Sequence, residues 1–299
     1  MLGGIGTRFS LRAADRRRRG ILAKIGTVYP LEEVNTCLCG GTEFERIGTK
    51  ERHGVPTGVS LCKACGLCVL TPRLTEEALV RFYESDYRTL YRGSDHIEDS
   101  YFERSYRRGE RLIAFLKERG IVMHSHVVVE IGCGPGGILK ALQEAGNEVL
   151  GCEYDRQCAA AAMERGVKTL IGGIGVLIEA GVTADLVVLS HLFEHVPHPY
   201  AFLRDLRRIL KAGGMLYVEV PGLRNPNNHF FDSLQVAHLY YFDLETLRFV
   251  MARGGFALVW GDEFVRSVFR REQPVNLTPP EGNFARNRAV IDQWARMRP

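Results

Sequence analysis

A glycine-rich turn between a buried valine run and an amphipathic helix constrains this chain more than any other feature. Residues 127–129 are three valines that predict a buried strand, and glycine fills four of the six positions 132–137. Glycine allows a tight turn and lets a ligand approach the backbone at the start of the next helix. Gly132, Gly134 and Gly137 match G-x-G-x-x-G, which by itself is a weak sign of nucleotide binding.

An acidic residue lies where a nucleotide-binding turn needs one. Residues 149–152 predict a second strand, and Glu153 ends it, 21 residues after Gly132. A carboxylate at that strand end can accept both ribose hydroxyls of a nucleotide. A simple tight turn is the alternative explanation of the glycines. The strand, the glycine loop, the helix and the acidic residue follow one another at the spacing of a nucleotide-binding unit, which argues against a simple turn.

Strand and helix patterns alternate through the rest of this region, which predicts an α/β domain with a parallel, doubly wound sheet. Further strands are predicted at 167–171, 186–189, 215–220, 256–260 and 264–269, and helices near 156–165, 199–211 and 243–253.

The loop from Glu130 to Gly136 resembles the E/D-x-G-x-G-x-G signature of class I S-adenosylmethionine-dependent methyltransferases. Three later segments resemble the same family in the same order: Asp185 to Val196, Leu210 to Pro221 and His238 to Phe242. The resemblance implies a Rossmann-like seven-stranded sheet, mostly parallel, with an antiparallel last strand. Glu130 and the turn at Glu194-His195-Val196 argue against the alternative of a nicotinamide-dependent oxidoreductase.

The resemblance also implies that S-adenosylmethionine lies over the carboxyl ends of the first two strands. We assign its binding to Glu130, Gly132, Cys133, Gly134, Gly136, Glu153, Tyr154 and Ser190. Many relatives have an acidic residue after the third strand, where this chain has residues 171–175, Ile-Gly-Gly-Ile-Gly. Backbone and apolar contacts are therefore expected to hold the adenine.

A histidine-rich turn follows the predicted fourth strand. His191, Glu194, His195 and His198 are three, one and three residues apart, so one helical turn would present them together. Three roles stay open for this turn: a general base for the methyl acceptor, a divalent metal site, or structural support. Our catalytic candidates are His195, His238, Glu194 and His191.

The residues before His238 bear on which atom is methylated. In sugar C-methyltransferases, which this chain resembles, a Tyr-His-Glu-His run serves the chemistry at this place. Here the run is Gln235, Val236, Ala237 and His238, so only the last histidine is kept. We therefore expect transfer to oxygen or nitrogen over transfer to carbon, with a C-methyltransferase as the alternative.

Four cysteines predict a structural zinc site, Zn²⁺ held by Cys37, Cys39, Cys62 and Cys65. The region resembles the zinc-ribbon head of the subfamily that includes sugar C-methyltransferases. It departs from the usual C-x-x-C first knuckle, because Thr36 stands where the first cysteine would be. A metal-free loop is the alternative. We expect the head and the main domain to have separate cores.

These patterns divide the chain into a flexible basic arm (1–30), a zinc-ribbon-like module (31–74), a helical linker (75–122), the methyltransferase domain (123–272) and a tail (273–299).

Charge and hydropathy limit the classes of partner that this protein can bind. The net charge is +4, and residues 1–24 carry an excess of six positive charges, so nucleic acid would have only this short arm to bind. No apolar run approaches the roughly 20 residues that span a bilayer, and no signal peptide is evident, so we expect a cytoplasmic protein without integral membrane contact. By family analogy, the acceptor is a small polar molecule such as a sugar nucleotide or glycan. A non-catalytic binding protein with a zinc head is the rival function.

Overall fold

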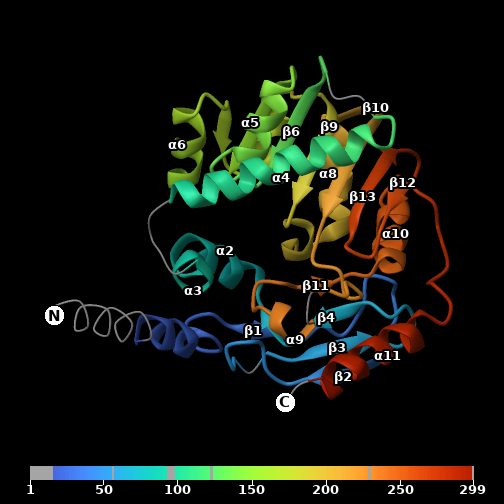
Figure 1. Ribbon diagram of the computed structural model, residues 1–299. Helices are drawn as coiled ribbons and strands as arrows, with labels where there is room; N and C mark the ends of the chain where they lie inside the picture. Colours follow the sequence, from blue (N-terminus) through green and yellow to red (C-terminus); the bar gives the residue numbers. More distant parts are fainter. Residues whose placement is uncertain (1–15, 56, 93–97, 122–123, 228–229, 298–299) are drawn as a thin grey trace.

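The computed structural model describes residues 16–55, 57–92, 98–121, 124–227 and 230–297. These residues form two lobes, one around a seven-stranded sheet and one around a small antiparallel sheet (Figure 1). No helix in these ranges is long and apolar enough to cross a membrane.

The central sheet has the strand order β12-β13-β10-β9-β6-β7-β8. Its strands are β6 (Val127–Ile131), β7 (Glu148–Glu153), β8 (Thr169–Ile171), β9 (Ala184–Ser190), β10 (Leu210–Glu219), β12 (Phe256–Gly261) and β13 (Arg266–Arg271). β13 runs antiparallel to both of its neighbours, and β6 to β10 pair in parallel. The predicted α/β fold with seven strands and an antiparallel last strand is confirmed.

Helices cover both faces of this sheet. They are α4 (Asp99–Lys117), α5 (Gly137–Glu144), α6 (Arg156–Glu164), α7 (Ile174–Glu179), α8 (Pro199–Ile209) and α10 (Leu244–Arg253). Neighbouring strand residues face opposite layers, so Val128 packs in the apolar layer of α4 and α5 and Val129 in that of α7, α8 and α10. At Gly109 of α4 a Cβ would lie 2.9 Å from the backbone of Ile138, so glycine permits the close contact with α5.

The small lobe is built from both ends of the chain. Its sheet has the order β11-β4-β3-β2, and the final strand β11 is supplied from beyond β10 (Figure 1). Its elements are β1 (Leu31–Glu32), β2 (Phe44–Gly48), β3 (Val59–Cys62), β4 (Cys68–Leu70), β5 (Arg73–Leu74), α2 (Glu76–Ser85), α3 (Tyr87–Arg92), α9 (Phe230–Ser233), β11 (Tyr240–Tyr241) and α11 (Asn283–Arg296).

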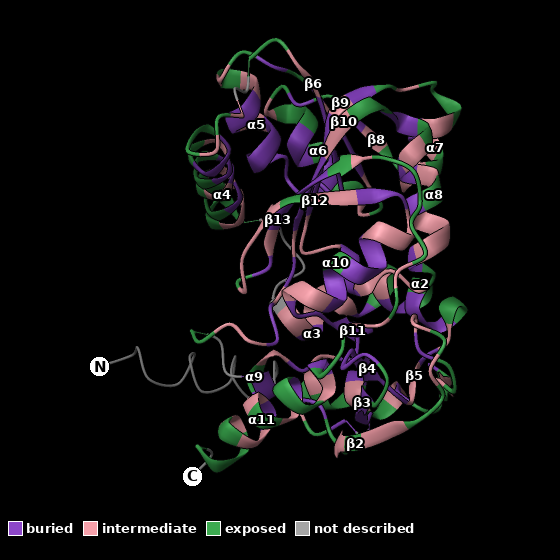
Figure 2. Ribbon diagram, turned by 90° about the vertical axis from the view of Figure 1, so that its right-hand side faces the viewer, coloured by how far each residue is buried: buried purple, intermediate pink, exposed green. Residues whose placement is uncertain are grey.

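The two lobes share one hydrophobic core. Cys37, Cys62 and Val69 of the small lobe belong to the same buried cluster as Val187 and Leu216 of the central sheet. Figure 2 shows buried residues continuing from the central sheet through α10 into β4 and β3. The expectation of separate cores is wrong, because the segment after β10 returns to pack against the small lobe.

The N-terminal segment is ordered from residue 16 onward, where a flexible arm was expected. Residues 16–24 are helical, and Ile21 and Tyr29 are buried in the shared core. The flexible arm expected over 1–30 is therefore wrong from residue 16 onward, because apolar side chains anchor the segment. Residues 1–15 lie outside the described ranges.

The C-terminal segment also differs from the prediction of a tail. The segment expected as a tail over 273–299 contains α11, which packs beside β2 and β3 (Figure 1). Ile291 is 1% exposed there. The sequence does not predict this helix because two of its three buried residues are Asn283 and Asn287, so no apolar stripe marks the buried face, and polar contacts hold it.

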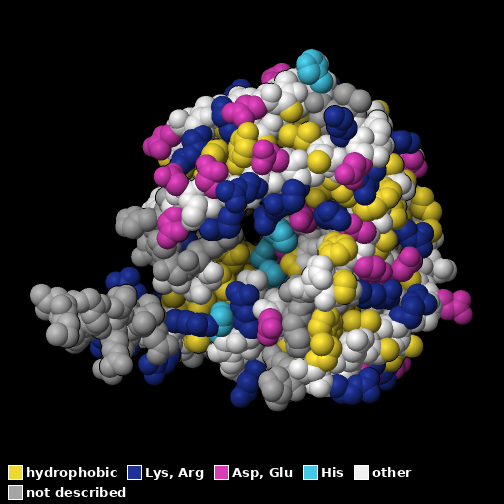
Figure 3. Space-filling model, in the orientation of Figure 1, with side chains coloured by type: hydrophobic (Ala, Val, Ile, Leu, Met, Phe, Trp, Pro, Cys, Tyr) yellow, Lys and Arg dark blue, Asp and Glu magenta, His cyan; other side chains and the backbone are white. Residues whose placement is uncertain are grey.

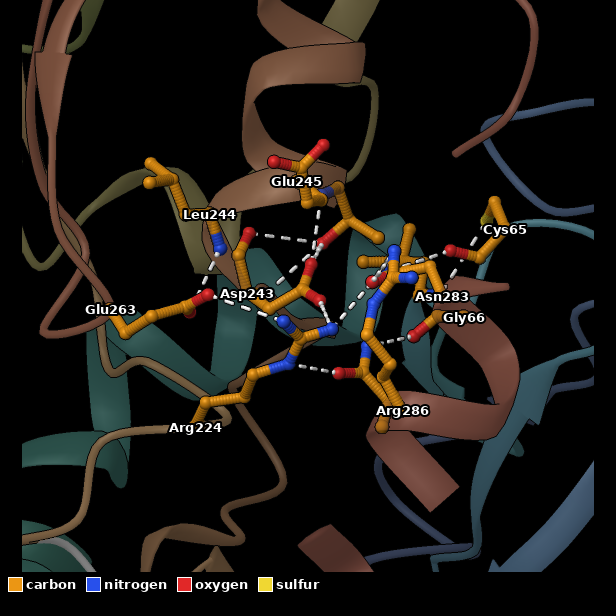
Figure 4. A network of polar contacts seen from close by, with 12 residues as sticks. Cys65, Gly66, Arg224, Asp243, Leu244, Glu245, Glu263, Asn283 and Arg286 are labelled. Carbon is orange, nitrogen blue, oxygen red and sulfur yellow. Dashed lines mark hydrogen bonds and ion pairs between the residues drawn. The ribbon is translucent and has the colours of Figure 1, made fainter. Parts of the chain in front are cut away.

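Arg224, in the segment that follows β10, is the centre of those polar contacts. Its guanidinium lies 2.7 Å from the carboxylate of Asp243, which is fully buried and caps α10. It also donates a hydrogen bond to Asn283 of α11, whose side-chain amide donates to the carbonyl of Cys65 at 2.9 Å (Figure 4). One side chain thus joins the central domain, the C-terminal helix and a cysteine turn.

We expect Arg224→Met to lower the free energy of unfolding by about 3–5 kcal/mol, because it leaves the buried Asp243 carboxylate without its partner. The control is Arg248→Met, which breaks an exposed pair with Glu245 and should cost about 0.5 kcal/mol or less. Urea unfolding of both variants measures the difference. Equal losses in the two would contradict this role.

Candidate active site

The glycine loop joins β6 to α5 at the carboxyl edge of the central sheet. Gly132, Gly134 and Gly136 have φ angles of 73°, 54° and 81°, which lie in the left-handed region that favours glycine. At Gly134 a Cβ would also lie 2.8 Å from the hydroxyl of Tyr101 on α4. Both the backbone conformation and the approach of α4 therefore require glycine in this loop.

Glu153 holds the glycine loop in place. One carboxylate oxygen accepts a 2.8 Å hydrogen bond from the backbone N–H of Gly134, and the other accepts one of 2.9 Å from Asp155. A carboxylate oxygen has two lone pairs, so each can still accept a bond from a ligand hydroxyl. The predicted ribose-binding residue is thus beside the loop.

Two buried polar atoms at the ends of neighbouring strands lack a hydrogen-bond partner among the described residues. Glu130 of β6 is 2% exposed, and its Oε2 has no hydrogen-bond partner within the described chain. Burial raises the pKa of this carboxyl group. The Oγ of Ser190, at the end of β9, is also buried without a partner there. Unpartnered buried polar atoms are costly, and a bound ligand with polar groups would offset that cost.

Cys133 and Tyr154 lie differently from the other predicted cofactor residues. The Cys133 side chain is 2% exposed and packs in the α5 apolar layer, so only its backbone contributes to the loop. Tyr154 is 76% exposed, and its ring lies so close to Gly173 that a Cβ there would be 2.8 Å from it. An aromatic ring and a bare glycine backbone thus stand where many relatives have an acidic residue.

A buried carboxylate and three histidines gather after β9. A short 3₁₀ helix (Phe193–His195) turns Glu194 inward, where it is 1% exposed. Its Oε1 lies 3.6 Å from His191 Nδ1 and 3.8 Å from His195 Nε2, both beyond hydrogen-bond length. The His195 and His238 rings meet edge to face with centroids 4.7 Å apart.

The charges of this cluster are strongly coupled. Burial opposes ionisation of Glu194, but His195 and His191 outweigh it and lower its pKa to about 2. Burial, and then His195, lower the pKa of His238 to about 3. His198 does not join the cluster, because its side chain is 63% exposed and lies 3.1 Å from a glutamate of α2.

The contacts of His195 define its protonation. Its Nδ1 lies 2.8 Å from the carbonyl oxygen of Ala237 and 2.7 Å from the hydroxyl of Tyr83. A carbonyl only accepts, so Nδ1 carries a proton and Nε2 faces Glu194. A neutral ring would point a lone pair at that carboxylate. Nε2 is therefore placed either to take up a proton, giving an imidazolium that Glu194 stabilises, or to bind a cation together with Glu194.

An aromatic wall from the linker helices completes the cluster, and the sequence prediction of the site did not include it. Besides the Tyr83 contact, the Tyr87 ring lies with its centroid 6.3 Å from that of His195, and the Tyr91 hydroxyl accepts a 3.0 Å hydrogen bond from the Val236 N–H. The signal was the spacing of four residues between these tyrosines, which would place them on one face of a continuous helix. In the structure Tyr83 belongs to α2, and Tyr87 and Tyr91 belong to α3.

A cavity of about 360 Å³ opens beside the histidines, between α4 and the ends of β10 and β13. Its lining includes Arg108, Arg111, His191, Glu219, Phe264 and Arg266. Figure 3 shows a hollow on this face, with histidine side chains inside it and Lys or Arg side chains along the rim.

A family model described as a methyltransferase domain matches residues 101–260, which is more than half of the chain. The chain belongs to the methyltransferase domain family. The seven-stranded sheet agrees with this, and the resemblance found in the glycine loop and the later segments is confirmed.

The chain is similar to several curated proteins. It is 27% identical over 201 residues to the C-methyltransferase NovU of Streptomyces niveus. That match covers 64% of this chain and 44% of NovU. It is 26% identical over 126 residues to a ubiquinone biosynthesis O-methyltransferase of Bordetella avium, covering 40% of this chain and 52% of that one. The chain thus spans about half the length of the curated relatives it matches.

A solved structure has the same fold. The 1,6-didemethyltoxoflavin-N1-methyltransferase of Burkholderia thailandensis, crystallised with 1,6-didemethyltoxoflavin and S-adenosylhomocysteine, is 15% identical. The match covers 73% of this chain and 96% of that one with a TM-score of 0.50.

The four cysteines of the small lobe converge. The Sγ atoms of Cys37 and Cys65 are 3.6 Å apart, as are those of Cys39 and Cys62, and all four lie within 4.8 Å of one another. Zinc–sulfur bonds of about 2.3 Å in a tetrahedron place sulfurs about 3.8 Å apart. The four thiols therefore fit a tetrahedral zinc ion.

Proposed function

We propose that this methyltransferase binds S-adenosylmethionine at the glycine loop and transfers its methyl group to an oxygen or nitrogen atom of a small polar acceptor. The observation that carries the proposal is the position of Glu194 and His195 directly after β9, which pairs with β6. Neighbouring strands are about 4.8 Å apart, so a proton acceptor adjoins the loop that follows β6.

The residues of the loop fit this cofactor. Glu153 would accept the ribose hydroxyls, and the unpartnered oxygens of Glu130 and Ser190 would meet polar groups of the cofactor. The Burkholderia structure, which holds S-adenosylhomocysteine on the same fold, supports this choice. When bound, S-adenosylmethionine supplies a methyl group on a sulfonium, and the sulfur leaves with the bonding electrons as the neutral thioether.

His195 is the proposed general base. An acceptor hydroxyl or amine that attacks the methyl carbon must lose its proton, and Nε2 of a neutral His195 would take it. Glu194 would stabilise the imidazolium that forms, and the Ala237 carbonyl fixes the proton on Nδ1. His238, with its lowered pKa, stays neutral and supports the His195 ring by packing.

The surroundings of His238 support oxygen or nitrogen as the methylated atom. Val236 and Ala237 are fully buried and apolar, and Gln235 cannot act as an acid or base at neutral pH. Abstraction of a carbon-bound proton needs several donors that stabilise the carbanion, and among these three positions the side-chain amide of Gln235 is the one donor. We propose a sugar nucleotide or glycan as the acceptor class, by analogy with the relatives that this chain resembles.

A divalent ion is the second candidate for the same cluster. One ligand atom each from Glu194, His195 and His238 lies within 4.8 Å of the others. Both Glu194 oxygens lack a hydrogen-bond partner among the described residues. Two imidazoles and a single carboxylate suit a transition metal better than magnesium. Such an ion would bind the acceptor oxygen and lower its pKa.

The cysteine cluster is proposed to hold a structural zinc ion, so purified protein should contain close to one zinc per chain. Cys62→Ser should release it, and because the lobes share a core, the loss should destabilise the whole chain and not the head alone. Elemental analysis and thermal unfolding measure both effects. Cys68→Ser is the control, since Cys68 is buried in β4 outside the cluster and should leave the zinc bound. A zinc-free, well-folded protein would refute the site.

Binding of S-adenosylhomocysteine tests the cofactor proposal. Gly134→Val should abolish it, because the side chain meets Tyr101 and the φ of 54° disfavours valine. Glu153→Ala should weaken it by about 1.5–3 kcal/mol, the scale for hydrogen bonds to a charged group. Gly48→Val in β2 of the small lobe is the control, because a Cβ there meets nothing within 4 Å. Calorimetry that finds no binding to the wild type, or tighter binding of NADH, would favour the rival functions.

The base is tested with ¹³C-methyl-labelled S-adenosylmethionine and a small-molecule extract of the source organism. His195→Ala should reduce label transfer by about 10²–10⁴-fold while cofactor affinity stays unchanged. The surface variant His198→Ala should leave transfer unaffected. Loss of activity in EDTA, restored by a transition metal, would instead support the divalent-ion candidate. A carbon–methyl signal in the product NMR spectrum would disprove transfer to oxygen or nitrogen.

A further inference from the structure

We infer that the acceptor of this methyltransferase carries an anionic group, which Arg108 and Arg111 bind at the rim of the cavity beside His191. The inference rests on the proposed function, because it assumes that the molecule in this cavity is the methyl acceptor. It adds a binding site and a chemical class, a phosphate or carboxylate, to that function.

Arg108 and Arg111 share one side of α4. They are three residues apart, which places both side chains over the same surface of the helix, and both line the cavity. Arg108 is half-buried and Arg111 is exposed, and neither makes a hydrogen bond or ion pair with another residue in the described ranges. Two guanidinium groups therefore offer free donors in the forked geometry that matches carboxylate and phosphate oxygens.

The other charges of the cavity leave a positive excess. Arg266 is already paired, because its guanidinium donates to the Asp262 carboxylate at 3.2 and 2.6 Å. Glu219 is the carboxylate among the lining residues, and it accepts a 3.3 Å hydrogen bond from the Tyr217 hydroxyl. Arg108 and Arg111 together exceed that single negative charge. A concave wall with this surplus attracts anions.

The cavity lies on the side of the sheet where the acceptor is expected. Tyr217 and Glu219 belong to β10, which is three strands from the ribose-binding Glu153 of β7, or about 14 Å at ordinary strand spacing. His191, which also lines the cavity, lies 3.6 Å from Glu194, the carboxylate beside the proposed base His195. The volume of about 360 Å³ suits a small molecule, and Phe115 and Phe264 give its uncharged part an apolar wall.

The test is calorimetric titration of protein saturated with S-adenosylhomocysteine, with inorganic pyrophosphate in one arm and succinate in the other. We expect at least one probe to bind, pyrophosphate if the acceptor is phosphorylated and succinate if it is a carboxylate. Arg108→Gln combined with Arg111→Gln should weaken that binding at least about ten-fold. Raising NaCl from 50 to 200 mM should weaken it in the wild type. The control is Arg107→Gln, because Arg107 is an exposed arginine of the same helix and does not line the cavity. This variant should leave both the probe affinity and its dependence on NaCl unchanged.

Three outcomes separate this inference from the proposed function. Failure of S-adenosylhomocysteine to bind the wild type would defeat the proposed function itself. Normal cofactor binding without binding of either probe would overturn the anionic acceptor alone. Displacement of the probe by S-adenosylhomocysteine, with weaker cofactor binding in the double variant, would assign the arginines to the cofactor carboxylate and also overturn it.

Discussion

The pairing of β11 with β4 is the contact on which the arrangement of the two lobes depends. Tyr240 pairs with Val69 and Tyr241 with Cys68, so a segment from beyond the central sheet completes the small sheet. His238 lies two residues before this pair and is thereby brought against His195. The small lobe is thus part of the site and not an appended module, because it fixes the strand that presents one of the histidines.

Burial of a single carboxylate organises the chemistry of the site. Glu194 is almost completely buried, so its charge is stable only beside positive or polarisable partners, and histidines from two segments provide them. The same arrangement suits a general base and a metal ligand set, since both need a carboxylate next to an imidazole nitrogen. Which chemistry operates depends on whether a proton or a metal ion lies between Glu194 and His195.

The C-terminal helix links the cysteine cluster to the central domain. The side-chain amides of Asn283 and Asn287 donate to the carbonyls of Cys65 and Gly66, and Arg224 connects them to the central domain. A metal ion that stiffens the cysteine turn would therefore also order this helix. The loop that carries Arg224 contributes Pro221 and Asn225 to the cavity, so the network reaches the cavity wall.

Local pattern in the sequence determined the seven-stranded sheet, the glycine loop with Glu153, and the two cysteine pairs, because strand periodicity, positive-φ turns and short ligand spacings are written within a few neighbouring residues. Only the tertiary structure decided which distant side chains meet. It brought His238 and Tyr83 to His195, set Cys133 in the apolar layer, and turned the expected N-terminal arm and C-terminal tail into packed helices. The physical reason is that these contacts join segments separated by 40 to more than 200 residues, where burial of shared apolar surface and pairing of polar groups, and not local propensity, choose the partners.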